Sequence, residues 1–290
     1  MQESKLMSRM YDVLKKTEKE RSAYKVIGIE EEVEAPETQI AEAPGEDSVA
    51  PEAMSPISAT PDPIALDALL ARCRATDWMP NTKTMLFFGS DEPLGGAEEF
   101  RTLRTQLFHL REKQPLRRIL VTSSVPKEGR SFVAANLALA MARQAGCRVL
   151  LIDADLRHPS LHSALGTSAT PGLSEYLLDE TEEFDIIQRG QMGSLFFIAS
   201  GRSVSGQAEV VGNGRLKFLL ERLEPIFDWI IIDSPSAMVS DSSLMATFCE
   251  GILMVVRSNS TPFDIVRKAR QRFPYERLLG VVLNKVPAGV

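Results

Sequence analysis

The stretch TSSVPKEGRSFVAANLALA, residues 122–140, decides how the rest of the sequence is interpreted. An apolar run at 118–123 leads into it, and the small and apolar residues after Ser131 are typical of a buried helix. A loop between a strand and a helix N-terminus points backbone N–H groups at bound anions. Gly129 permits close approach to a phosphate, and the Ser131 hydroxyl is suited to hold Mg²⁺. The stretch therefore predicts a phosphate-binding loop.

The loop departs from the pattern G-x-x-x-x-G-K-[ST] at two positions. Ser124 stands at the first glycine, and Arg130 stands at the lysine. This motif alone is compatible with two interpretations: a nucleotide-binding site, or an ordinary strand–turn–helix that contains a glycine.

Aspartates that close apolar runs favour the nucleotide site. VLLIDADLRHP carries Asp153 and Asp155 at its end, and WIIIDSPS carries Asp233. A single aspartate at a strand end is commonly a turn former. Three of them in a chain with a phosphate-type loop are better explained by a site, because ligands of open α/β sheets gather at the carboxyl ends of the strands. Ser131, Asp153, Asp155 and Asp233 are the predicted ligands of a divalent cation.

Alternation of apolar runs with helical patterns predicts the fold class. The expected strands are 84–88, 118–123, 148–152, 194–198, 228–232, 251–256 and 279–283. The expected helices are 96–112, 131–145, 215–224, 242–249 and 262–272. Several strands are apolar on both faces, as covered parallel strands are. The pattern predicts one α/β domain over residues 80–290, with a doubly wound, mostly parallel sheet.

The N-terminal part of the chain is of a different kind. Residues 1–25 have apolar positions at helical spacing among charged residues, which fits either a partly formed terminal helix or a docking helix for a partner or membrane surface. Residues 26–79 are predicted to be a disordered, acidic, proline-rich linker. Within it, residues 26–71 hold eleven Asp/Glu and no Lys/Arg, so the net negative charge of the chain, -6, comes from this segment.

Composition excludes several classes of protein. Outside the acidic segment the charges nearly balance, so nothing favours binding to nucleic acid. Cys73, Cys147 and Cys249 are scattered, which favours reduced thiols over a disulfide framework or a zinc site. No signal peptide or membrane-length apolar run is visible, so the expected location is cytoplasmic, or at the inner face of the plasma membrane through a partner.

Several motifs, in order along residues 84–290, resemble those of the bacterial tyrosine kinases (BY-kinases) of capsule and exopolysaccharide systems. TSSVPKEGRS is similar to their phosphate loop, LLIDADLRHP to their second Walker-type motif, and IIIDSP to their Walker B strand. EEFRTLRTQL at 98–107 matches their E-x-x-R-x-x-R helix, and TPGLSEYL at 170–177 and LLGVVLNKV at 278–286 also fit. The N-terminal MSRMYDVLKKTEKER resembles the leader of the exosortase-associated subgroup.

The resemblance implies a P-loop NTPase fold of the deviant-Walker type and transfer of phosphate from Mg·ATP to tyrosine. Its implied nucleotide-binding residues are Ser124, Pro126, Lys127, Glu128, Gly129, Arg130, Ser131, Phe132 and Asn284, the last as an adenine contact. Its implied catalytic residues are Arg130, Asp153, Asp155 and Asp233. Glu98, Arg101 and Arg104 are the implied interface of a ring-type homo-oligomer. A membrane-spanning polysaccharide chain-length regulator is the implied partner.

Some residues depart from that family. Arginine keeps the charge of the loop lysine but is longer and forked, so Arg130 predicts slow turnover. Lys127 is either a compensating ammonium or an exposed loop residue. The sequence ends LNKVPAGV, without a tyrosine cluster, which leaves Tyr11 and Tyr24 as candidate self-substrates. The segment 200–211 lacks the Asn-Pro pair of the family.

Three hypotheses about function follow. The chain is a tyrosine kinase or ATPase that tolerates Arg130, or it is a catalytically degenerate scaffold that assembles and regulates polysaccharide synthesis. A partition-type ATPase is disfavoured, because Val125 stands where that class has a further lysine. A paired metal site at His158 and His162 is also disfavoured, since Pro159 interrupts helical geometry. The interpretation we favour is a kinase-family protein of exopolysaccharide biosynthesis that binds Mg·nucleotide.

Overall fold

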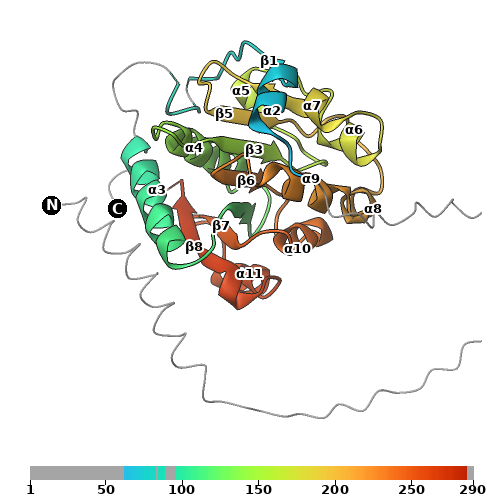
Figure 1. Cartoon of the computed structure of the whole chain (residues 1–290). Helices are drawn as coiled ribbons and strands as arrows, with labels where there is room; N and C mark the ends of the chain where they lie inside the picture. Colours follow the sequence, from blue (N-terminus) through green and yellow to red (C-terminus); the bar gives the residue numbers. More distant parts are fainter. Residues whose placement is uncertain (1–61, 83, 89–95, 286–290) are drawn as a thin grey trace, which may run out of the picture. The chain divides into compact units, whose positions relative to one another are not determined.

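The computed structural model describes residues 62–82, 84–88 and 96–285 (Figure 1). The predictions for residues 1–25, for Tyr11 and Tyr24, and for the linker before residue 62 lie outside the described residues. Within the described part of the chain, no helix has the length and apolar character needed to cross a membrane.

One sheet of eight strands forms the centre of the domain, in the order β1-β4-β5-β3-β6-β2-β7-β8. The strands are β1 (Arg74–Ala75), β2 (Arg118–Ser123), β3 (Val149–Asp153), β4 (Ile187–Arg189), β5 (Leu195–Ile198), β6 (Trp229–Asp233), β7 (Gly251–Arg257) and β8 (Leu278–Asn284). All neighbouring pairs are parallel except β4 and β5. The predicted doubly wound, mostly parallel sheet is therefore confirmed.

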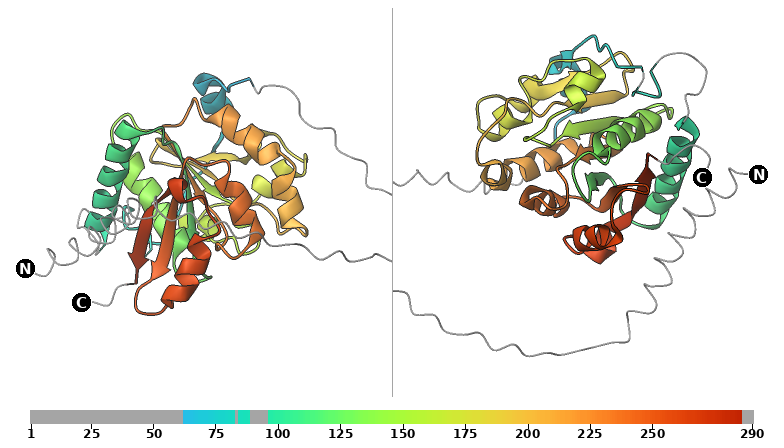
Figure 2. Two further views of the ribbon diagram at one scale, coloured as in Figure 1. Left: turned by 90° about the horizontal axis from the view of Figure 1, so that it is seen from below. Right: turned by 180° about the vertical axis from the view of Figure 1, so that it is seen from behind.

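Helices cover both faces of this sheet (Figure 2). Along β2, Ile119 and Val121 belong to one apolar cluster and Leu120 to the other, as the alternation of side chains along a strand requires. The first cluster includes α3 (Ala97–Lys113), α4 (Arg130–Ala142) and α5 (Leu161–Leu165). The second includes α2 (Leu66–Arg72), α6 (Leu173–Leu177), α7 (Glu183–Ile186), α8 (Gln207–Gly212), α9 (Arg215–Leu223), α10 (Ser240–Ala246) and α11 (Phe263–Arg270).

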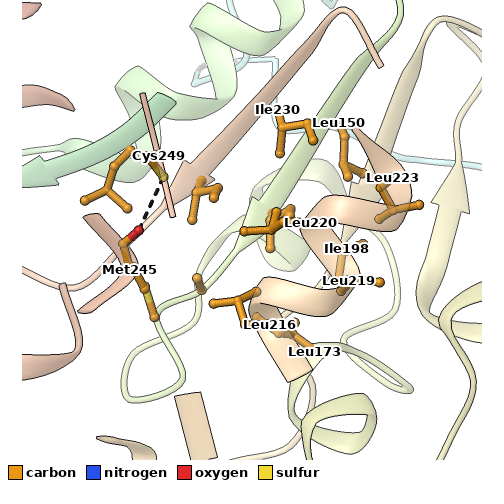
Figure 3. Close-up of a cluster of buried hydrophobic side chains, with 14 of the residues drawn as sticks. Leu150, Leu173, Ile198, Leu216, Leu219, Leu220, Leu223, Ile230, Met245 and Cys249 are labelled. Atoms are coloured by element: carbon orange, nitrogen blue, oxygen red, sulfur yellow. Dashed lines mark hydrogen bonds between the residues drawn. The ribbon is translucent and has the colours of Figure 1, made fainter. Parts of the chain in front are cut away.

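Figure 3 shows how α9 packs on the second face. Leu216, Leu219, Leu220 and Leu223 recur at helical spacing and are fully buried against the sheet. Cys249 lies in the same cluster, where burial raises the pKa of its thiol to about 12. The three cysteines are free, and the high pKa keeps Cys249 in the unreactive thiol form.

The expected strand at 84–88 is wrong, because these residues form turns. Met85 and Phe87 are buried and Leu86 and Phe88 partly buried, but the backbone of these residues does not join the sheet. Instead, Asn136 of α4 accepts a hydrogen bond from the Leu86 N–H at 2.8 Å and donates to the Thr84 carbonyl at 2.9 Å. A buried side-chain amide thus satisfies the polar groups that strand pairing would otherwise satisfy.

The boundary placed at residue 80 is too late. Ile64 and Leu69 are buried in the second cluster, and α2 begins at Leu66. The Ile64 N–H donates to the carbonyl of Arg222 at 3.2 Å, just before α9 ends. The short helix α2 belongs to the domain, but it was assigned to the linker because the residues before it are acidic and rich in proline. The strands β1 and β4, of two and three residues, were also not predicted.

Candidate functional site

The order of the central strands brings the phosphate-type loop and the aspartates together. Strands β3, β6 and β2 are neighbours, and Asp153 and Asp233 are paired in the register of β3 and β6. Asp233 also lies opposite Val121 of β2, whose carboxyl end continues into the loop. The loop then enters α4 at Arg130. All four segments therefore meet at one edge of the sheet, as the sequence predicts.

Gly129 allows the tight entry into α4. Its φ of +94° lies in the left-handed region, and a Cβ atom at this position would clash with the amide nitrogen of Asn284. That amide donates a hydrogen bond to the Glu128 carbonyl at 2.8 Å. The end of β8 thus packs directly against the loop, and only glycine fits between them.

Glu128 holds the loop from inside. Its side chain is buried, with an exposed fraction of 1%, and accepts hydrogen bonds from the Val125 N–H at 2.9 Å and the Arg257 N–H at 3.1 Å. The Thr261 hydroxyl donates to the same carboxylate. Glu128 therefore connects the loop to the end of β7, and its part in nucleotide binding stays a prediction.

Arg130 folds back toward the aspartates instead of toward solvent. Its Nη2 donates to Oδ2 of Asp155 in a close ion pair, and its Nε lies 3.7 Å from Oδ1 of Asp233. The exposed fractions of the three side chains are 10%, 3% and 0% for Arg130, Asp155 and Asp233. Such an ion pair interacts strongly, because little water screens it.

Backbone N–H groups supply the remaining partners of two aspartates. Asp153 accepts hydrogen bonds from Ser160 and Leu161 at 3.1 Å each and from Asp155 at 3.3 Å. Asp155 accepts others from Arg157 at 3.2 Å and His158 at 3.0 Å. The loop after β3 is therefore folded around these two carboxylates.

Asp233 is the exception among the three aspartates. Neither of its oxygens has a hydrogen-bond partner among the described residues, although the Ser131 hydroxyl lies near enough to lower its pKa. Burial and the charge of Asp153 act more strongly in the other direction and raise the pKa of Asp233 to about 7. Burial likewise raises the pKa of Asp153 to about 6, against the backbone N–H groups and Arg130.

Oxygen ligands of this kind suit Mg²⁺ in chemical type. As they stand, however, they do not fit a bound metal. No three His, Cys, Asp or Glu side chains within the described ranges converge on a common metal position. The cation that lies beside Asp155 and Asp233 is the guanidinium of Arg130. Metal ligation by Ser131, Asp153, Asp155 and Asp233 stays a prediction.

Other residues predicted to bind nucleotide lie around the loop in different ways. Ser124 is buried, and its hydroxyl contacts the Met254 sulfur at 3.8 Å. Pro126 and Lys127 are exposed, and Lys127 adopts a positive φ of 69°. Phe132 packs edge-on against Phe100 at 5.8 Å between ring centroids. Their roles in binding stay predictions.

The three residues predicted to mediate assembly lie on α3 but have different partners. Glu98 and Arg101 form an ion pair on the exposed side of the helix. Arg104 donates to the Ala140 carbonyl at 2.9 Å and so joins α3 to α4. The histidines also separate, because His158 precedes α5 and His162 lies within it.

The ion pair between Arg157 and Asp241 was not predicted from the sequence. Their charged atoms lie 3.1 Å apart, and the Asp241 side chain is 2% exposed. The pair joins the loop after β3 to α10, which follows Asp233 along the chain. An LRHP segment directly after Asp155 was the signal available, but its partner lies 84 residues away.

Sheet order, loop and strand-end aspartates together define a protein of the P-loop type. No family model matches the chain. The tyrosine-protein kinase YwqD of Bacillus subtilis is 31% identical over 191 residues, which are 65% of this chain and 80% of YwqD. The tyrosine-protein kinase CpsD of Streptococcus agalactiae serotype Ia is 32% identical over 198 residues, 67% of this chain and 84% of CpsD.

Solved structures give the same result. The kinase domain of the Escherichia coli tyrosine kinase ETK has a TM-score of 0.66 and 29% identity, covering 81% of this chain and 92% of that domain. The chimerical protein CapA2B2 has a TM-score of 0.66 and 28% identity, covering 77% of this chain and 98% of that one. The chain belongs to the bacterial tyrosine-protein kinase family.

Proposed function

We propose that this chain is a nucleotide-binding regulator of capsule or exopolysaccharide biosynthesis with slow protein-tyrosine kinase activity. One observation carries the proposal. In a member of the tyrosine kinase family, a glycine-containing loop enters α4 directly beside three strand-end aspartates. A site that had been abandoned would have little reason to keep the loop, Ser131 and all three carboxylates together.

The expected ligand is Mg·ATP, with its phosphates at the N-terminus of α4 and its base toward Asn284. Backbone N–H groups and the positive end of the helix dipole would supply most of the phosphate binding. Arg130 limits the chemistry, because its guanidinium must leave Asp155 before it contacts a phosphate. Loss of one preorganised charge contact costs roughly 10²–10³ in rate, which is why we propose slow turnover.

The proposed partners are further copies of this chain and a membrane-spanning chain-length regulator. Family membership supports both, and the exposed pair of Glu98 and Arg101 on α3 leaves that face accessible for assembly. The proposed location is the cytoplasm, at the inner face of the plasma membrane when the regulator is bound.

A second candidate is a scaffold that assembles without nucleotide. The ion pairs of Arg130 with Asp155 and Asp233 favour it, because they neutralise the site from within the chain.

Calorimetric titration with Mg·ATP and Mg·ADP separates the two candidates. We expect the wild-type chain to bind in the micromolar range and the Arg130→Lys variant to bind more tightly. Arg118→Lys is the matched control, since Arg118 lies between two carboxylates at the other end of β2 and should leave affinity unchanged. Binding by Arg130→Lys alone would instead support the scaffold.

The kinase part of the proposal needs its own measurement. Incubation of the full chain with labelled ATP should give slow incorporation of phosphate into tyrosine, and Arg130→Lys should accelerate it. Nucleotide binding without any incorporation, in the wild type or in Arg130→Lys, would contradict the proposed kinase activity. The proposal of a nucleotide-binding regulator would remain.

A further inference from the structure

The charges at the loop end of β2 are arranged around a single cation. Arg130 contacts Asp155 directly and lies 3.7 Å from Asp233, and its charge also lowers the pKa of Asp153. Among the described residues, no other lysine or arginine forms an ion pair with these aspartates. One guanidinium thus supplies the positive charge that lies beside three buried carboxylates.

This arrangement leaves polar atoms without partners on both sides. Nε of Arg130 and both oxygens of Asp233 are buried and have no hydrogen-bond partner in the described part of the chain. Buried charges are costly unless they are paired or coordinate a metal. The guanidinium therefore compensates the carboxylates by proximity, without the directed contacts that a dedicated salt bridge would make to Asp233.

We propose that Arg130 is an internal cation that takes the place of a divalent metal at Asp153, Asp155 and Asp233. In the wild-type chain the carboxylates are compensated without metal, and the guanidinium excludes Mg²⁺ from them. Removal of the guanidinium creates a site of oxygen ligands that Mg²⁺ or Mn²⁺ occupies. The inference concerns the chain without nucleotide, so its test is independent of the proposed nucleotide binding.

Thermal unfolding of the full chain without nucleotide tests the proposal. The Tm of the wild type should be the same in EDTA and in millimolar MgCl2. Arg130→Ala should unfold at a lower temperature in EDTA, and MgCl2 should raise its Tm by about 5 °C, because a ligand that binds only the folded state stabilises it. Arg118→Ala removes the arginine between Glu224 and Glu250, and its Tm should fall without any response to MgCl2.

Direct binding of Mn²⁺ is the second readout, in case Arg130→Ala folds poorly. The milder variant Arg130→Gln keeps the methylene groups and a polar end but lacks the charged guanidinium. It should bind one Mn²⁺ by electron paramagnetic resonance, whereas the wild type should leave the metal free. The double variant Arg130→Gln/Asp233→Asn should lose that binding. Tight Mn²⁺ binding by the wild type, or no binding by Arg130→Gln, would overturn the proposal.

Discussion

Two arginines stand at opposite ends of the central strand β2, and each lies between two carboxylates. Arg118 begins the strand and contacts Glu250, with Nε 2.8 Å from Oε1, while Glu224 lies 3.7 Å away. Arg130 follows the loop at the other end and contacts Asp155, while Asp233 lies 3.7 Å away. The local pattern of charge is nearly the same at both ends of the strand.

The two clusters differ in their exposure to solvent. Glu250 and Glu224 are 22% and 35% exposed, whereas Asp155 and Asp233 are 3% and 0% exposed. At Arg118, burial lowers the pKa of the guanidinium, but the hydrogen bond to Glu250 and the nearby charges of Glu250, Glu224 and Cys249 together raise it above its usual value. At Asp153 and Asp233, burial raises the pKa of the carboxyl groups in spite of their favourable contacts. The same residue type is therefore a structural clamp at one end, whereas at the other we propose that it controls which ligands bind.

Double-mutant cycles should show the largest difference between the clusters. We expect a coupling energy of about 2–3 kcal/mol between Arg130 and Asp155, measured with Arg130→Ala and Asp155→Ala, because buried charges are weakly screened. The matched cycle of Arg118→Ala and Glu250→Ala should give about 0.5–1 kcal/mol, as partly exposed pairs do. Denaturant unfolding of the single and double variants supplies both values.

Comparison of the two coupling energies tests whether burial distinguishes the two clusters. Equal coupling energies would mean that burial does not distinguish the clusters, and the different roles assigned to Arg118 and Arg130 would lose their physical basis.

Stability should also depend on pH through the loop-end cluster. The raised pKa of Asp233, about 7, means that the folded chain binds a proton more readily than the unfolded chain, whose aspartates titrate near the usual 3.8. The free energy of unfolding should therefore be highest below about pH 4 and fall as the pH rises from about 4 to about 7, by roughly 3 kcal/mol. Asp233→Asn should flatten this fall.

Salt provides the control for this measurement. Because burial is the main cause of the shift, the fall with pH should persist at high ionic strength, where interactions between exposed charges are screened. An Asp233→Asn variant with the slope of the wild type would show that another group causes the pH dependence.

The sequence predicted the site more reliably at the level of the backbone than at the level of the side chains. Apolar runs that end in Asp153 and Asp233 mark strand ends, and parallel strands bring such ends together whatever the details of packing. The direction of the Arg130 side chain has no such signal, because it depends on Asp155, 25 residues away, and on the space left between strands. Sequence alone therefore identified Arg130 as unusual but not what it contacts.

The run at 84–88 shows the same limit in the fold. Its apolar composition is that of a strand, and only the partner of its backbone, Asn136 of α4, decides otherwise. A buried asparagine in an otherwise apolar helix was a possible clue, although it does not say which segment the amide will contact.

The smallest predicted effect concerns lysine at both arginine positions. Lysine keeps the charge but is a point donor, so it holds one carboxylate well and two poorly. Arg118→Lys should lower the free energy of unfolding by about 0.5 kcal/mol, because water compensates the exposed glutamates. Arg130→Lys should cost about 1–2 kcal/mol in the absence of nucleotide and metal, because Asp233 is fully buried and the lost charge contact is not replaced by solvent.

Urea unfolding of the two lysine variants in EDTA measures this difference directly. EDTA matters, since a metal bound to Arg130→Lys would restore part of its stability and hide the loss. A larger cost at Arg118 than at Arg130 would reverse the order of the two clusters. The guanidinium at the loop would then be a replaceable charge, and the forked shape of arginine would not be what the buried carboxylates require.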